Sequence, residues 1–145
     1  MDLSADLSAL IPRWNIEGAD VLPPSEPAQI ETLFAQLGQP ATAEVVALYS
    51  TLGGMATMDN EFWRMWSLQE IQEENQGPPS DWGVLFSDYL IHSHVFRLRT
   101  TADGASSEVF ADFLREDIAP IRVAASLREF FALYRSDPDR VLALR

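Results

Sequence analysis

Apolar residues at helical spacing mark two helices near the start of the chain. The first is predicted to begin at Pro27, which suits a first helical turn, and to end before Gly38. Its apolar face consists of Ile30, Leu33, Phe34 and Leu37. The second helix repeats the spacing with Val45, Leu48, Tyr49 and Leu52. We expect it to stop at Gly53-Gly54, where glycine would supply a left-handed cap.

Further helices are indicated by apolar clusters and by capping residues. A lead-in helix within residues 1–20 would pack through Leu7, Leu10, Ile11 and Trp14. Capping boxes at Ser67–Glu70 and Ser126–Glu129 predict a short helix to about Asn75 and a C-terminal helix. The buried stripe of the C-terminal helix would be Leu127, Phe130, Phe131 and Tyr134. After Asp137-Pro138, a final apolar anchor would consist of Val141, Leu142 and Leu144.

The middle of the chain is rich in aromatic and β-branched residues with alternating character, which predicts strands. The expected strands are Phe62–Trp66, Gly83–Phe86, Tyr89–Arg99 and Glu108–Leu114. Asp103-Gly104 predicts a hairpin turn, and Pro120 limits residues 118–123 to an edge strand or a connection. The order predicts an α+β domain, in which two N-terminal helices and a C-terminal helix pack against an antiparallel sheet of about four to six strands.

Composition adds limits to this picture. The 145 residues match a single domain over 1–145, and the 47% of hydrophobic residues is typical of a globular fold. The chain has no cysteine, so thiolate metal sites and cysteine nucleophiles are excluded. The N-terminus lacks a basic leader, and no segment approaches the ~20 apolar residues of a membrane span. We therefore expect a cytoplasmic protein. All ten positive charges are arginine, a codon bias that indicates a bacterial source.

Negative charge is concentrated in the first part of the chain. Residues 1–88 hold fourteen acidic residues against two arginines, whereas residues 89–145 hold eight acidic residues and eight arginines. The net charge of −12 therefore falls within residues 1–88. Such a field repels nucleic acid and anionic lipid and attracts basic proteins, although solubility alone would also explain it.

Few residues suggest chemistry. Without lysine there is no phosphate-binding loop of the Gly-Lys type, and no Gly-x-Ser-x-Gly is present. His92 and His94 would lie on one face of a strand, about 7 Å apart, where a metal could bind between them. Asp88 would lie about 13 Å along that strand, too far to be a third ligand without a bend. Half-buried structural histidines are therefore the favoured interpretation, and we expect no metal and no cofactor.

Acidic and aromatic residues suggest a docking surface instead. Glu73 and Glu74 have no evident local role on the short helix, and Asp81, Asp59 and Glu61 would extend their acidic surface if the fold brings them near. A solvated acidic face is the simpler alternative. Trp63 and Trp66 would point to opposite faces of a strand, so that one of them could be exposed. Trp82, between a proline-rich loop and a strand, is the preferred exposed anchor.

The order of these motifs resembles the SUKH superfamily, the group named for a yeast cell-wall assembly regulator. The matching segments are Leu22-Pro23, Leu48–Gly54, Trp66–Ile71, Gly83–Tyr89 and Ala125–Leu133. The similarity runs over residues 22–134, with residues 1–21 as a lead-in segment and 135–145 as a C-terminal anchor. The resemblance implies an α+β domain without catalytic residues, which in bacteria often acts as an immunity protein that neutralises toxins, many of them nucleases.

These observations predict a non-catalytic protein-binding domain, an immunity protein against a basic, nuclease-type toxin. Two alternatives stay open at this point. One is a housekeeping or regulatory interaction scaffold of the same fold. The other is a small enzyme or metal-binding protein centred on His92 and His94.

Overall fold

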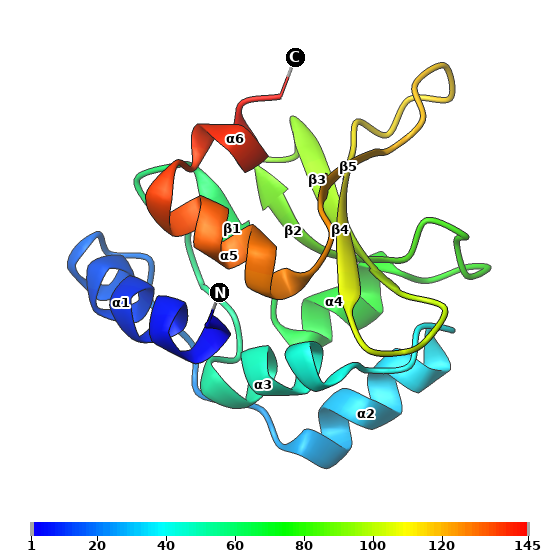
Figure 1. Cartoon of the computed structure of the whole chain (residues 1–145), viewed down its shortest axis with the longest axis horizontal. Coiled ribbons are helices and arrows are strands. Elements are labelled where there is room, and N and C mark those ends of the chain that lie inside the picture. The colour runs from blue at the N-terminus through cyan, green and yellow to red at the C-terminus, as the bar shows by residue number, and fades with distance from the viewer. Residues whose placement is uncertain (1, 145) are drawn as a thin grey trace.

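The strands follow one another in a simple meander, with the sheet order β1-β2-β3-β4-β5 and every pairing antiparallel. This computed structural model describes residues 2–144, which form six helices and five strands (Figure 1). The α+β class and the antiparallel sheet are confirmed. The elements are α1 (Leu3–Ile16), α2 (Pro27–Gln36), α3 (Ala43–Thr51), β1 (Trp63–Met65), α4 (Leu68–Glu74), β2 (Val84–Tyr89), β3 (His94–Thr100), β4 (Ser107–Asp112), β5 (Ile121–Ala124), α5 (Leu127–Ser136) and α6 (Asp139–Leu142).

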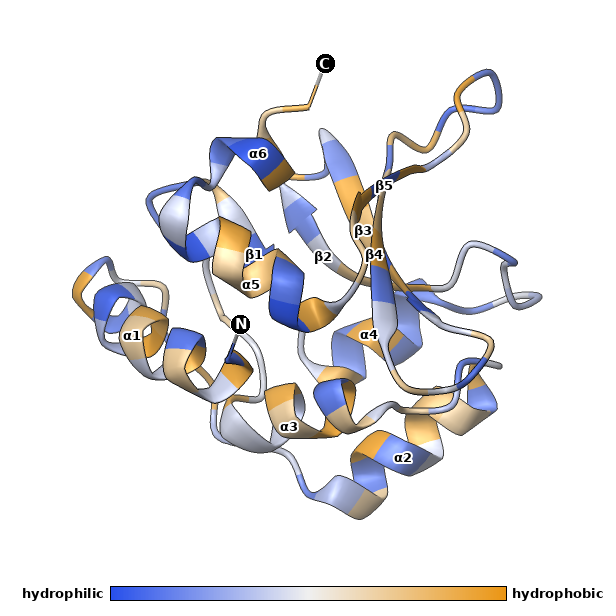
Figure 2. Ribbon diagram, in the orientation of Figure 1, coloured by the Kyte–Doolittle hydropathy of each residue, from blue (hydrophilic) through white to orange (hydrophobic). Residues whose placement is uncertain are grey.

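An aromatic cluster joins α5 to the inner face of the sheet. Figure 2 shows α5 with distinct apolar and polar sides, and its predicted stripe is fully buried. The Phe130 ring lies 5.8 Å from those of both Trp63 and Phe96 and 6.4 Å from that of Phe86. Rings at these distances bury large apolar areas and add specific edge contacts. The inner face of the sheet and α5 therefore form the centre of the core.

The predicted caps of two helices differ from those in the structure. Ser126 caps α5 by accepting from the Glu129 N–H, but the Glu129 carboxylate accepts from Ala125 and no reciprocal box forms. The prediction of a left-handed glycine cap for α3 is wrong, because α3 ends at Thr51 and the residue that follows it, Leu52, is extended. Gly53 is needed for a close approach, since a Cβ there would lie 2.1 Å from the Pro23 carbonyl oxygen. The capping box at Ser67 is confirmed at the start of α4.

The predicted single strand Tyr89–Arg99 is wrong. Tyr89 ends β2, residues 90–93 form a turn, and β3 begins at His94, which pairs with Tyr89. The neighbouring predictions are confirmed: a turn at Asp103-Gly104 joins β3 to β4, and β5 is an edge strand after Pro120. Asp88 and His92 therefore lie on either side of a bend, which changes the analysis of the histidines.

Candidate functional site

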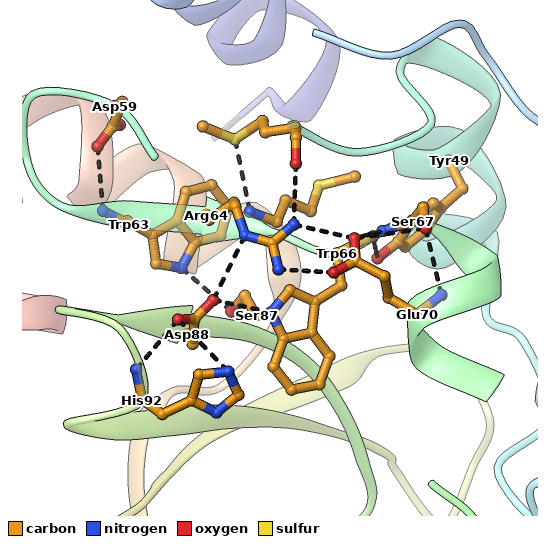
Figure 3. A network of polar contacts seen from close by, with 12 residues as sticks. Tyr49, Asp59, Trp63, Arg64, Trp66, Ser67, Glu70, Ser87, Asp88 and His92 are labelled. Carbon is orange, nitrogen blue, oxygen red and sulfur yellow. Dashed lines mark hydrogen bonds and ion pairs between the residues drawn. The ribbon is translucent and has the colours of Figure 1, made fainter. Parts of the chain in front are cut away.

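A network of charged and aromatic side chains lies on the outer face of the sheet (Figure 3). Its centre is Arg64 of β1, which donates to both carboxylate oxygens of Glu70 on α4, at 2.9 and 2.6 Å. Arg64 Nε also lies 3.9 Å from Asp88 Oδ1 on β2. The hydrogen bond from Arg64 lowers the pKa of Glu70, and the same bond raises the pKa of Arg64. This ion pair therefore joins α4 to the sheet, and the carboxylate of Glu70 neutralises the positive charge of Arg64.

Asp88 also accepts hydrogen bonds from Trp66 and from His92. Its Oδ1 accepts from Trp66 Nε1–H at 2.8 Å, and its Oδ2 accepts from the His92 backbone N–H at 3.1 Å. The His92 ring stacks on Trp66 with 5.7 Å between the centroids. Trp63 points to the inner face, where its Nε1–H donates to Ser87. The expectation that Trp63 or Trp66 is exposed is wrong, because α5 covers one side and this network the other.

The two histidines have different environments. His92 lies in the turn with its side chain half exposed, 3.9 Å from Asp88 Oδ2. His94 is buried between the rings of Tyr89 and Phe113, and burial lowers its pKa, although a hydrogen bond with the Leu142 backbone opposes the shift. The bend thus brings Asp88 to His92, which an extended strand would have kept apart. Within residues 2–144, no three His, Asp or Glu side chains gather to hold a metal ion.

We expect the purified protein to keep no stoichiometric transition metal after dialysis. The reason is the donor set: the imidazole of His94 is enclosed by aromatic rings, which leaves His92 and Asp88 as only two donors. Structural and catalytic zinc sites use at least three protein ligands. Elemental analysis by mass spectrometry measures the content directly. A metal present at one equivalent, and lost in His92→Ala, would contradict this prediction.

Asp59 is buried and cannot belong to a docking surface. Its Oδ2 accepts from Trp14 Nε1–H at 2.8 Å and from the Tyr134 hydroxyl, and its Oδ1 accepts from the backbone N–H groups of Glu61 and Trp63. Only 3% of its surface is exposed. Burial raises the pKa of Asp59, while the four donors act in the opposite direction. The inclusion of Asp59 among the partner-binding residues is therefore corrected: it joins α1, β1 and α5.

Glu61 lies beside this buried group and not beside α4. It is half-buried, and burial raises its pKa, with further contributions from the negative charges of Asp59, Asp139 and Glu17. Arg13 opposes that shift but forms its own ion pair with Glu17. The sequence-based set of acidic residues is therefore divided between two places in the fold.

Glu73 and Glu74 are both exposed on α4, as expected. Glu73 accepts from Gln69 at 3.2 Å. A groove of about 500 Å³ runs between α2 and α4. Four glutamines contribute to its lining: Gln29, Gln36, Gln69 and Gln72. The acidic side chains of α4 thus adjoin a groove lined by uncharged side chains, apolar ones such as Leu33 and Leu68 as well as glutamines.

Asp81 and Trp82 lie in the loop that follows α4, and both are exposed. Trp82 keeps 37% of its surface accessible while its ring packs against Phe110, with 5.5 Å between centroids. The Arg99 guanidinium lies 5.4 Å from the Trp82 ring. Together with Leu114 and Ile118, Trp82 lines a shallow hollow on the outer face of the sheet. The expectation that Trp82 is exposed is confirmed.

The arginines are almost all used in ion pairs within the protein. In residues 2–144, eight of the nine arginines contact a carboxylate, Arg140 being the other. Some of these pairs cross between the two parts of the chain, such as Arg128 with Glu44 and Arg135 with Asp6. In the described part of the chain, α2, α4 and the following loop present acidic residues without an ion pair: Glu26, Glu31, Glu73, Glu74 and Asp81. This acidic surface, defined by these five residues, is the candidate site.

The contacts of Arg64 with Glu70 and Asp88, which support α4, were not predicted from the sequence. One signal was available, because Arg64 is the only arginine between Arg13 and Arg97 in a strongly acidic stretch. A lone cation among carboxylates indicates a specific ion pair. The partners, however, depend on the fold, since Glu70 is six residues away and Asp88 is on another strand.

Comparisons with known proteins add no relatives: no protein-family model matches the chain, and no curated protein has a matching sequence. Among the helices of residues 2–144, none combines the length and the apolar character required to cross a membrane.

Proposed function

We propose that the protein is a non-catalytic binding domain that docks a basic protein, and that it neutralises a toxin of the nuclease type. The observation that carries this proposal is the acidic surface, whose residues lack ion pairs while nearby Arg64 is held by Glu70 and Asp88. Carboxylates left without cations create a field that speeds the approach of a positively charged partner and disfavours wrong partners. Basic nuclease domains belong to that class of partner.

Two further observations support binding over catalysis. Shifted pKa values often mark active sites. Here the most strongly shifted groups, Tyr49 and Tyr134, are buried, and burial raises the pKa of each. Tyr49 donates to the Trp66 carbonyl and Tyr134 to Asp59, so each has a structural partner. The motif order that resembles the SUKH superfamily agrees with the same role.

The test begins with capture of the partner. The tagged chain is used to retain proteins from a lysate of the source cell, and the retained protein is identified by mass spectrometry and purified. We expect a basic protein whose nuclease activity disappears when one equivalent of the chain is added. A retained protein that is acidic, or whose activity is unaffected by the chain, would contradict the proposal.

We expect Glu73→Lys/Glu74→Lys to slow association with the captured basic protein about tenfold, within the range by which electrostatic steering changes association rates. Both side chains are exposed, so the fold should persist, since surface charges usually contribute less than about 1 kcal/mol. Surface plasmon resonance at low and high salt measures the rate. Salt should slow the wild type, because it shortens the Debye length below about 8 Å.

The matched control is Glu116→Lys/Asp137→Lys. These residues are also exposed and without ion pairs in the described structure, but they lie in the β4–β5 connection and after α5. The net charge changes equally, so a general charge effect would slow both variants alike. An association rate indifferent to salt and to the α4 reversal would show that the charge serves solubility alone.

A further inference from the structure

The turn between β2 and β3 has a backbone conformation that its residues disfavour. Leu90, Ile91 and His92 all have positive φ values, of 49°, 50° and 66°. Glycine and asparagine are the usual residues in such turns, because a side chain that branches at Cβ crowds the backbone there. Ile91 is β-branched and is therefore among the least suitable residues for its position.

The same turn exposes its apolar side chains. Ile91 is 75% exposed and Leu90 is 42% exposed. Phe62, which precedes β1, is 49% exposed and has a φ of 64°. Its carbonyl accepts from the Leu90 N–H at 2.9 Å, so the two segments are joined. These three residues form one apolar tip, in which each side chain keeps a large part of its surface exposed to solvent.

Specific contacts hold the apolar tip in place. The Asp88 carboxylate accepts from the His92 N–H, and the His92 ring stacks on Trp66 (Figure 3). Ser93 donates from its N–H to the Tyr89 carbonyl and from its hydroxyl to the Leu90 carbonyl. Strained backbone persists only where its surroundings fix it, and a fixed surface loses little entropy on binding. The tip is thus presented in one conformation.

We propose that the apolar tip of Phe62, Leu90 and Ile91 inserts into an apolar pocket on the basic partner, and that it determines how long the complex lasts. This inference rests on the proposed function. Apolar anchors that fill a pocket usually dominate binding energy and dissociation. The surroundings of the tip indicate the partner's charge. Glu61 is adjacent to Phe62 in the chain, and Glu17, Asp139 and Arg13 lie close to Glu61. Arg13 is paired with Glu17, so Glu61 and Asp139 leave this region acidic. A pocket with a basic rim is therefore the complementary surface.

The tip lies apart from the acidic surface. Asn75, after α4, bonds to Leu85 at the start of β2, whereas the turn follows Tyr89 at the other end of that strand. Figure 1 shows this end of the sheet next to α6. The two surfaces can therefore be altered separately, so that steering and anchoring are measured independently.

The experiment replaces Ile91 with residues that suit its backbone, Ile91→Gly and Ile91→Asn. Because both relieve the disfavoured conformation, neither should lower the melting temperature. With the captured basic protein immobilised, we expect dissociation to become at least about tenfold faster, while the association rate and its salt dependence stay unchanged. A purely structural role for Ile91 would give the reverse, a loss of stability without a change in binding.

Ile121→Gly is the matched control, because Ile121 is also apolar and β-branched, is 42% exposed and lies on the edge strand β5. It should leave dissociation unchanged, and equal weakening by both glycine variants would overturn the assignment to the tip. Equal affinity of wild type and both Ile91 variants would overturn the inference and leave the proposed function intact. A self-associated dimer in sedimentation, lost in Ile91→Gly, would assign the tip to a second copy of this chain and overturn it. A wild-type chain that retains no basic protein would overturn both proposals.

Discussion

We expect Phe130→Ala to lower the free energy of unfolding by about 3–5 kcal/mol, the usual range for a buried phenylalanine truncated to alanine. Phe130 is 0% exposed and lies at the centre of the aromatic cluster. Its ring is 5.2 Å from that of Phe131 and 5.8 Å from that of Trp63. Rigid rings on both sides cannot collapse into the space that remains, so the loss includes a cavity as well as lost burial.

Urea denaturation and a thermal melt measure this loss. For a chain of this length, each 1 kcal/mol corresponds to about 2–4 °C in melting temperature, so a fall of about 10 °C is expected. Leu133→Ala is the control on the same helix, because Leu133 is only partly buried and its truncation should cost less. A Phe130→Ala variant that melts within a degree or two of wild type would contradict this account of the core.

The spacing of apolar residues in the sequence identified this part of the core, because the buried faces of its helices follow the helical repeat. Ile30, Leu33 and Phe34 on α2 and the stripe of α5 are buried as their spacing predicts. Each stripe faces a single layer, so a 3.6-residue repeat is sufficient to find it. The fold class and most helices could therefore be predicted from the sequence.

The turn after Tyr89 could not be predicted, because none of its three residues with positive φ is a glycine, asparagine or aspartate, the residues that usually signal such a conformation. Leu90-Ile91-His92 continues the apolar and aromatic character of the strands on both sides. Its conformation depends on Asp88, Phe62 and Trp66, which the fold assembles from separate segments. A conflict between local preference and observed conformation is expected where a sequence serves function.

The concentration of acidic residues in the first part of the sequence did not show which of them are buried and which are exposed. Glu44 belongs to the acidic first part, yet it is buried and accepts from backbone N–H groups at the start of α5, including Leu127 and Arg128. Asp59 is likewise internal. Sequence position cannot separate such structural carboxylates from those at the surface, because the separation depends on which donors the fold places near each one. Glu73, Glu74 and Asp81 remain exposed.

We expect Asp59→Asn to lower the free energy of unfolding by about 2–6 kcal/mol, because each of two buried donors left without an acceptor costs about 1–3 kcal/mol. The carboxylate accepts from four donors, which matches its full capacity. An amide has one oxygen and places an NH₂ group against donors, so at least two buried donors lose their acceptor. Asp20→Asn is the control, because Asp20 is exposed and has no ion pair in residues 2–144. A variant as stable as wild type would show that Asp59 does not join α1, β1 and α5.

The effect of Asp59→Asn should also depend on pH in a defined direction. Burial raises the pKa of Asp59 in the folded protein, so folding favours its protonated form. Its contribution to stability is then greatest below the unfolded pKa of about 4 and falls as the pH rises to the folded value. Asparagine does not titrate, so the difference in unfolding free energy between wild type and variant should shrink as the pH rises through that window. Urea denaturation of both proteins from pH 3.5 to 8 measures the difference. A difference that grows with pH would mean that the four donors outweigh burial and stabilise the anion.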